Sequence, residues 1–264
     1  MCRGCGRQTS VTAGTIFHRT RKPLRTWFAV MWFVCAQKNG TSAKGLQQMF
    51  GFGSYETAWA WLHKLRRAMV RPDRDRLGGP GLAVELDETF IGARTGRRDG
   101  PKYDNKARIV IAVERKHPTG LGRARMRVIH PGNVKADIED FCIDVIEPGT
   151  VLWTDGATHY NAIADRVGLT REVIELVHAP EPAHELMPAV HQVASLLKRW
   201  IAGTLHGGQS IDQLDYYLDE YTFRFNRRTS RSRGMLFYRL CQQAVAIDPQ
   251  PLNTLIATQR ENLS

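Results

Sequence analysis

The sequence predicts an α/β protein, with a mixed sheet flanked by helices and an all-α region before it. In residues 24–70 apolar side chains recur at three- and four-residue steps, as in packed helices. From residue 81 the chain changes to three consecutive β-type runs, followed by alternating strand-like and helix-like segments. A chain of 264 residues that is 42% hydrophobic can bury one large domain together with smaller ones.

The positive charge is concentrated at one end of the chain. Residues 1–80 contain 14 Lys and Arg against three acidic residues, whereas residues 81–264 contain 23 of each sign. The net charge of +11 therefore belongs to the first 80 residues. This asymmetry favours a basic nucleic-acid-binding segment joined to a balanced domain, because charge that serves only solubility would be spread more evenly.

Membrane and secreted classes are disfavoured. No window contains the about 18 uninterrupted apolar residues of a membrane span, and the first residues lack the apolar run of a secretory signal. Five scattered cysteines do not form a disulfide framework. We therefore expect a cytoplasmic protein without a membrane partner. Cys2 and Cys5 have the spacing of half a tetrahedral zinc site, but their spacing alone favours two reduced, exposed thiols.

Residues 24–70 are predicted to form three helices, at 24–39, 42–50 and 54–69. The last two are joined by a short turn that contains glycine, which is typical of a helix-turn-helix. In that motif the N-terminal residues of the second helix meet base edges, and basic residues contact phosphates. The alternative is an ordinary helical hairpin, and the basic surroundings favour DNA. The candidate DNA-contacting residues are Tyr55, Glu56 and Thr57 for bases, and Lys64, Arg66 and Arg67 for phosphates.

The rest of the chain divides into three predicted parts. Residues 71–80 are charged and turn-rich and are predicted to be a linker. Residues 81–208 are expected to form the α/β domain, and residues 209–264 a C-terminal helical extension of it. The expected strands are 82–91, 107–114, 123–129, 150–154 and 172–177, with helices at 135–146 and 158–167.

Two acidic residues stand out in the predicted sheet. Asp87 lies within the first strand and Asp155 follows the fourth. Carboxylates among apolar strands are costly unless they are paired, hydrogen-bonded or bound to metal. Two of them on neighbouring strands could hold hard divalent cations, which suit phosphodiester chemistry. Either residue alone fits a turn or a solvated edge equally well; the pair, beside a basic segment, favours the metal interpretation.

A predicted helix around residues 191–200 carries further polar residues. Its apolar stripe is Val190, Val193, Leu197 and Ile201, while His191, Ser195 and Lys198 share a neighbouring face.

The chain resembles bacterial insertion-sequence transposases of the DDE superfamily, in the ISXO-like branch. The resemblance is carried, in order, by Ser10–His18 with Lys22–Phe28, Thr57–Arg66, Asp87–Gly92, Thr154–Gly156, Ser195–Trp200 and Tyr221–Arg228. It implies a ribonuclease-H-like catalytic domain preceded by a zinc ribbon and a helix-turn-helix. It also implies cleavage and transfer of DNA strands at the ends of a mobile element, with two Mg²⁺ or Mn²⁺ ions.

The resemblance assigns roles to particular residues. Asp87 and Asp155 take the places of the first two catalytic acids. The third acid lies on a helix, seven residues before a lysine, and counting back from Lys198 gives His191 where Glu or Asn is usual. An imidazole can bind a metal ion but favours Mn²⁺ over Mg²⁺. We expect a triad of Asp87, Asp155 and His191, with Lys198 at a DNA phosphate; alternatively the copy is inactive, or Glu185 supplies a carboxylate.

The resemblance also matches Cys2 and Cys5 to the second C-x-x-C of a zinc ribbon, whose first pair would precede Met1. Residues 1–23 are therefore expected to be a partial ribbon that holds no zinc. Two basic clusters are candidates for phosphate contacts, although for the first a solvated loop is an equally good interpretation. They are Arg94, Arg97 and Arg98, and Arg227, Arg228, Arg231 and Arg233.

The function predicted is a transposase that acts as a homo-oligomer on double-stranded DNA, both the element's terminal repeats and the target. One alternative is a catalytically decayed transposase that acts only as a sequence-specific DNA-binding protein. A structure-specific nuclease on the same fold is disfavoured, because a helix-turn-helix implies recognition of defined ends.

Overall fold

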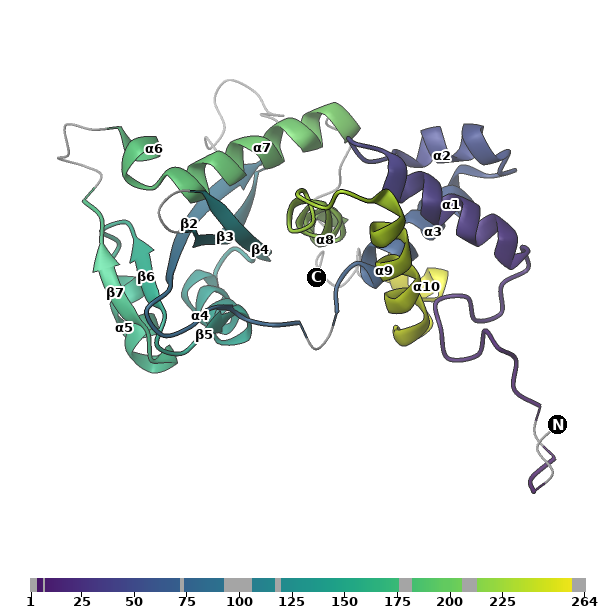
Figure 1. Ribbon diagram of the computed structural model, residues 1–264, viewed down its shortest axis with the longest axis horizontal. Helices are drawn as coiled ribbons and strands as arrows, with labels where there is room; N and C mark the ends of the chain where they lie inside the picture. Colours follow the sequence, from purple (N-terminus) through teal and green to yellow (C-terminus); the bar gives the residue numbers. More distant parts are fainter. Residues whose placement is uncertain are drawn as a thin grey trace. The chain divides into compact units, whose positions relative to one another are not determined.

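The computed structural model forms two compact units, which we describe separately (Figure 1). One unit comprises residues 1–72 and 227–264, and the other comprises residues 73–226. The prediction that residues 209–264 extend the catalytic domain is therefore wrong from residue 227 onward. The structure describes residues 4–6, 8–71, 74–92, 106–116, 120–175, 182–205 and 213–257.

The first unit is helical. It contains α1 (Leu24–Ala36), α2 (Ala43–Phe50), α3 (Tyr55–Ala68), α9 (Arg233–Ala246) and α10 (Leu252–Ala257). Serine side chains cap the N-termini of α2 and α3. Ser42 Oγ accepts the Gly45 amide at 3.1 Å, and Ser54 Oγ accepts the Thr57 amide at 3.1 Å. Gly51 ends α2 at a φ of 61°, which glycine adopts without strain. The three helices predicted from the sequence are thus confirmed.

Aromatic side chains form the core of this unit. Trp27 of α1 stacks on Trp61 of α3, with ring centroids 3.5 Å apart. Leu62 and Leu65 of α3 are also buried. Helix α9 packs against α1 and α3, and its Phe237 lies edge-on to Trp32. The C-terminal segment therefore completes the N-terminal core, which explains its place in this unit.

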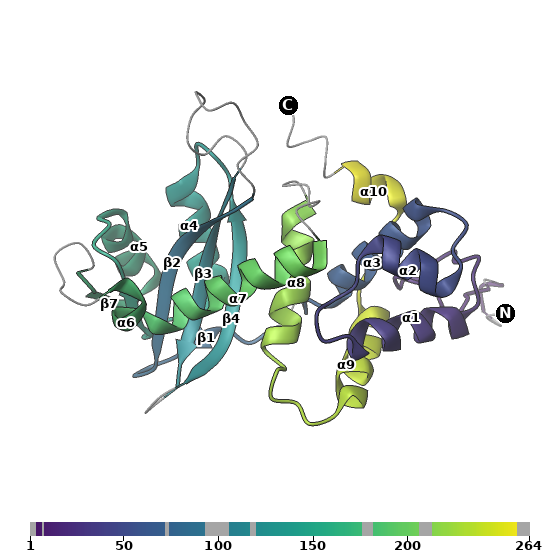
Figure 2. The same cartoon turned by 90° about the horizontal axis from the view of Figure 1, so that it is seen from above.

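The second unit is built on a five-stranded mixed sheet in the order β4-β3-β2-β6-β7 (Figures 1 and 2). Strands β2, β3 and β4 are antiparallel, and β6 and β7 run parallel to β2. The strands are β2 (Ala83–Ile91), β3 (Ala107–Arg115), β4 (Leu121–Ile129), β6 (Val151–Thr154) and β7 (Thr170–Val173). The helices are α4 (Val134–Val145), α5 (His159–Val167), α6 (Ala183–Leu186), α7 (Pro188–Leu205) and α8 (Leu214–Phe225).

Helices cover both faces of this sheet (Figure 1). Alternate residues of β2 and β3, such as Leu86 and Val110, pack with α4 and α5. The residues between them, such as Ile109 and Ile111, pack with α7 and α8 on the opposite face. This period-2 alternation fixes which side chains of β2 point toward α7. No helix within the described ranges is long and apolar enough to cross a membrane.

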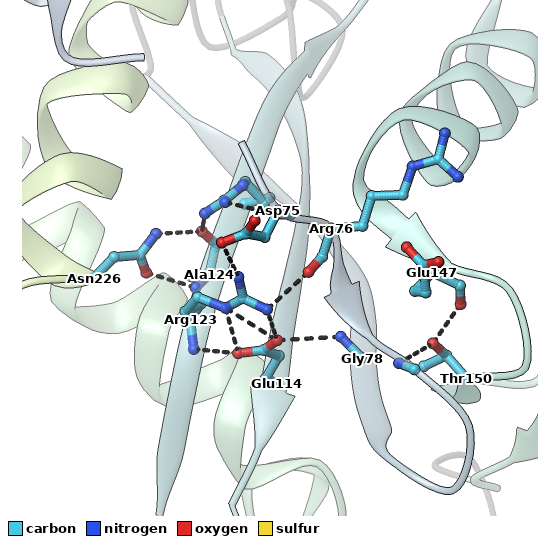
Figure 3. A network of polar contacts seen from close by, with 11 residues as sticks. Asp75, Arg76, Gly78, Glu114, Arg123, Ala124, Glu147, Thr150 and Asn226 are labelled. Atoms are coloured by element: carbon cyan, nitrogen blue, oxygen red, sulfur yellow. Dashed lines mark hydrogen bonds and ion pairs between the residues drawn. The ribbon is translucent and has the colours of Figure 1, made fainter. Parts of the chain in front are cut away.

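The open edge of the sheet, at β4, is closed by side chains from α8 and the residue after it. Asp215 Oδ1 accepts the Val128 amide at 3.1 Å. The Asn226 side chain accepts the Ala124 amide at 2.7 Å and donates to the Ala124 carbonyl at 3.0 Å (Figure 3). These bonds satisfy backbone groups that an unprotected edge would offer to another strand.

Residues 76–78 of the predicted linker are bonded to neighbouring strands. Leu77–Gly78 forms β1, which pairs with β5 (Ile146–Glu147). Glu114 of β3 accepts the Gly78 amide at 3.1 Å and the Arg123 guanidinium at 2.6 Å, and the same guanidinium donates to the Arg76 carbonyl (Figure 3). This network fastens the start of the second unit to β3 and β4.

Candidate active site

The register of the two parallel central strands places Asp87 beside Asp155. Glu85 of β2 pairs with Trp153 of β6. Two residues further along, Asp87 lies next to Asp155, which follows the last residue of β6. Neighbouring strands lie about 4.8 Å apart, and residues two apart share a face. Since the Glu85 carboxylate bonds to α7, both aspartates belong to the face that α7 covers.

The surroundings of Asp87 make its charged form costly. The side chain is half-buried, and its Oδ1 accepts the Glu88 amide at 2.8 Å. The pKa of Asp87 is raised to about 6, chiefly by burial and also by the charges of Asp155 and Glu88, against the opposing effects of the Glu88 amide and Lys198. Like charges held together in a half-buried site favour binding of a proton or a cation. The chemistry of this pair therefore fits a hard divalent ion.

Asp155 is held in a turn that β7 fixes from the side. Its Oδ1 accepts the Ala157 amide at 3.1 Å. Arg171 of β7 donates to the main-chain carbonyls of Asp155 at 2.6 Å and Ala157 at 3.0 Å, and to Thr154 Oγ1 at 2.8 Å. One guanidinium thus satisfies three acceptors around Asp155. This role of Arg171 was not predicted from the sequence, because the residue lies in a short, largely exposed strand.

Helix α7 has the predicted apolar stripe. Val190, Val193, Leu197 and Ile201 are all buried in the core beneath it. His191 is half-buried, and Ser195 and Lys198 are exposed. The effect of Lys198 on the pKa of Asp87 shows that its ammonium charge lies within electrostatic range of that carboxylate.

The described residues contain no group of three His, Cys, Asp or Glu side chains placed to hold a metal ion. The structure therefore brings together Asp87, Asp155 and the charge of Lys198, while His191 as a third ligand stays a prediction. Glu185 is exposed in the short helix α6, ahead of Pro188.

Glu88, the acid that follows Asp87, belongs to the opposite face of the sheet. It accepts the Tyr160 hydroxyl at 2.9 Å and lies 3.5 Å from Arg108 and from His159 Nε2. Its carboxylate thus ties the start of α5 to β2. The neighbouring carboxylates of Asp87 and Glu88 therefore have different roles on the two faces of the sheet.

The residues of α3 that were predicted to contact DNA differ in exposure. Tyr55, Glu56 and Arg67 are exposed, whereas Thr57 and Lys64 are half-buried. Arg66 is only 2% exposed, and it donates to the Thr41 carbonyl at 3.5 Å. The prediction that Arg66 contacts phosphate is therefore wrong, because this side chain belongs to the interior of the helical unit.

Positive charge gathers in the first unit around its C-terminal segment. Arg228, Arg231 and Arg233 are exposed. Burial lowers the pKa of the half-buried Arg227, and the charges of Arg71 and Arg239 lower it further. Three guanidiniums close enough to repel one another form a surface suited to an anion. Cys5 is exposed; Cys2 and the arginines at 94, 97 and 98 lie outside the described residues.

The five-stranded mixed sheet with helices on both faces is the arrangement of a ribonuclease-H-like fold. Residues 76–226 match the family described as the ISXO2-like transposase domain. This match spans more than half of the chain, which therefore belongs to the ISXO2-like insertion-sequence transposases.

Two further similarities accompany the family match. The chain is 26% identical over 256 residues to an "Uncharacterized protein in transposable element ISH50" of Halobacterium salinarum, covering 89% of this chain and 80% of the relative. A chain in the cryo-electron microscopy structure of the simian T-cell lymphotropic virus intasome with PP2A regulatory subunit B56 gamma has a TM-score of 0.35 and 12% identity. That likeness covers 80% of this chain and 72% of the viral complex's chain.

Proposed function

We propose that this transposase cuts DNA at the ends of its insertion sequence and joins the freed strands to target DNA, using divalent metal ions bound at Asp87 and Asp155. The observation that carries the proposal is the proximity of these two half-buried carboxylates, one within β2 and the other directly after the parallel strand β6, where the pKa of Asp87 is raised to about 6. Two protein carboxylates together with substrate phosphate oxygens are a usual ligand set for Mg²⁺.

The residues of the site have distinct parts in this reaction. When bound, Mg²⁺ or Mn²⁺ supplies positive charge to the attacking and leaving oxygens of the phosphodiester. Asp87 and Asp155 provide the carboxylates, and Arg171 keeps the Asp155 turn in place. Lys198 is exposed beside the pair and is proposed to contact a DNA phosphate. Holding the scissile strand in one orientation lowers the entropic part of the barrier.

His191 is proposed as the third metal ligand. It lies on α7 one residue after Val190, which is bonded directly to β2, and seven residues before Lys198. An imidazole adds no negative charge to the site, and it shifts the metal preference toward Mn²⁺. We therefore expect Mn²⁺ to support cleavage at lower concentration than Mg²⁺.

The helical unit is proposed to recognise the element's ends. Tyr55, Glu56 and Thr57 at the start of α3 would contact base edges, and Lys64 and Arg67 would contact phosphates. The second set of phosphate contacts would come from Arg227, Arg228, Arg231 and Arg233. Binding through this many cations depends steeply on salt, because counterions are released from the DNA. A homo-oligomer on DNA follows from the need to hold two ends together.

A second candidate function is sequence-specific DNA binding without catalysis, as in a decayed transposase. The observation that favours it is His191, which replaces an acid, together with the absence of a three-ligand group among the described residues. Both candidates predict DNA binding, so binding alone does not separate them.

Metal-dependent cleavage separates the two candidates. The substrate is a duplex that carries the element's end and its flanking DNA, incubated with Mn²⁺ or Mg²⁺. We expect strand cleavage by the wild type, loss of cleavage in Asp87→Ala and Asp155→Ala, and nearly unchanged binding of the same duplex by all three proteins. Equal cleavage by wild type and variants would overturn the assignment of the aspartates.

A further inference from the structure

Helix α7 begins without a capping residue of its own. It starts at Pro188, and the residue before it, Met187, has no side-chain oxygen that could accept the first backbone amides. The first amides of any helix lack partners within the helix, and an N-cap side chain commonly satisfies them. The cap of α7 must therefore come from elsewhere in the fold.

Glu85 of β2 provides that cap. Its Oε2 accepts the Val190 amide at 2.9 Å, and the amides of Val190 and Ala189 both oppose the rise that burial causes in the pKa of Glu85. The side chain is fully buried, at 0% exposure. A carboxylate at a helix N-terminus is favoured by the aligned peptide dipoles, and its amide bonds are strengthened by the charge.

Arg115 balances the buried charge of Glu85. Its Nε lies 3.5 Å from Glu85 Oε1, and its guanidinium stacks over the Trp153 ring at 4.1 Å. A buried carboxylate needs such a partner, since an unpaired charge in the interior is strongly destabilising. Glu85, Arg115 and Trp153 therefore form one connected group between β2, β3 and β6.

This group lies directly below the proposed metal ligands. Glu85 precedes Asp87 by two residues and Trp153 precedes Asp155 by two, and Glu85 pairs with Trp153 across the strands. Residues two apart on a strand share a face. The carboxylate that holds the start of α7 is therefore in the next layer of the same sheet face as the aspartate pair.

We propose that Glu85 is a positioning residue that fixes α7, and with it His191 and Lys198, over Asp87. The attachment is at Val190, next to His191 in the chain. A helix shifted by one residue moves about 1.5 Å along its axis and turns by about 100°. Without the cap, His191 and Lys198 would lose a defined place relative to the aspartates. The catalytic part of this inference rests on the proposed function; the attachment of α7 does not.

Glu85→Gln tests the inference, with Glu114→Gln as the matched control. Glu114 is also a strand glutamate that accepts a backbone amide, from Gly78, and an arginine. However, its bonds go to Gly78 of β1 and to Arg123 of β4, so it reports the general cost of losing such a carboxylate. A Glu85→Gln/Arg115→Met double variant removes the cation that the single variant leaves unbalanced, in case Glu85→Gln folds poorly.

The first measurement is backbone hydrogen exchange, which needs no activity. We expect the amides of residues 189–191 to exchange about tenfold faster in Glu85→Gln and in the double variant, since a helix cap protects the first turn. In Glu114→Gln they should exchange as in the wild type. Unchanged exchange at 189–191 in both Glu85 variants would overturn the proposal, whether or not the protein cleaves DNA.

The second measurement is single-turnover cleavage of the end-containing duplex, with binding of the same duplex measured in parallel. We expect the cleavage rate to fall about 10- to 100-fold in both Glu85 variants, because small misplacements of catalytic groups are this costly. Duplex affinity should change less than about threefold, and Glu114→Gln should keep its rate. Faster exchange with an unchanged rate would refute the positioning role. An inactive wild type would count against the proposed function alone.

Discussion

Replacing Asp87 by asparagine is expected to stabilise the metal-free protein while abolishing cleavage. Asparagine keeps an oxygen that can accept the Glu88 amide, as Asp87 Oδ1 does at 2.8 Å. It removes the negative charge that burial and the neighbouring Asp155 and Glu88 make unfavourable. Asp87 thus lowers the stability of the metal-free protein, and such a cost is expected of a charged residue that serves metal binding.

The size of this stabilisation follows from the pKa of Asp87. Folding raises that pKa from 3.8 to about 6, and each unit corresponds to about 1.4 kcal/mol. The ceiling is therefore about 3 kcal/mol, and we expect about 1–3 kcal/mol because the half-buried group is partly screened by solvent. In a domain of this size that free energy raises the Tm by about 3–9 °C.

The pH dependence has a definite sign. Because the folded state binds this proton more tightly than the unfolded chain, the contribution of Asp87 to wild-type stability falls as the pH rises from about 4 through about 6. The advantage of Asp87→Asn should therefore be full at pH 7.5 and nearly absent at pH 4. Calorimetric unfolding in EDTA at both pH values measures it. The reasoning would be refuted if Asp87→Asn were less stable than the wild type at pH 7.5. It would also be refuted if the variant exceeded the wild type in unfolding free energy by the same amount at both pH values.

Three further predictions concern residues outside the metal pair. Arg171→Met should slow cleavage about 10- to 100-fold with duplex affinity unchanged, because the Asp155 turn loses its side support; a rate equal to the wild type would contradict this. Arg67→Ala should weaken duplex binding and reduce the slope of log affinity against log salt concentration by about 1. Arg66→Ala should chiefly lower the Tm, since Arg66 is 2% exposed. If binding and unfolding measurements gave the reverse pattern, Arg66 would belong to the DNA-binding surface. Asn226→Ala should destabilise the protein by about 1–3 kcal/mol in urea unfolding, because the β4 amide and carbonyl of Ala124 lose their partner; no change would show that water replaces it.

Local sequence patterns predicted most of the fold because the interactions that decide it are local. Ser42, Gly51 and Ser54 bound α2 and α3 through neighbours a few residues away. The period-2 alternation located β2 and β3 almost to the residue. The assignment of Asp87 and Asp155 to one site depended on the family resemblance, since the register of β2 and β6 is set by the whole sheet.

The features that were missed depend on distant parts of the chain. The apolar stripe of α9, with Leu236 and Leu240, predicts burial but does not say against which unit. A basic residue such as Arg66 is normally expected on the surface, and its bond to the Thr41 carbonyl, 25 residues away, could not be predicted from the local sequence. Glu85 caps a helix that begins more than 100 residues later. For this role of Glu85 the sequence offered one signal, which is an acidic residue two positions before Asp87 and on the same face of the strand.

The central claim is that Asp87, Asp155 and His191 together form a working metal site. Its most direct test is the initial rate of end cleavage in Mn²⁺ and in Mg²⁺, compared for the wild type, His191→Ala and His191→Glu. We predict that the wild type cleaves best with Mn²⁺, that His191→Ala loses about 100-fold or more, and that His191→Glu remains active with a shift toward Mg²⁺. Equal rates for wild type and His191→Ala would contradict the claim, as would a wild type that is inactive with both ions while His191→Glu cleaves.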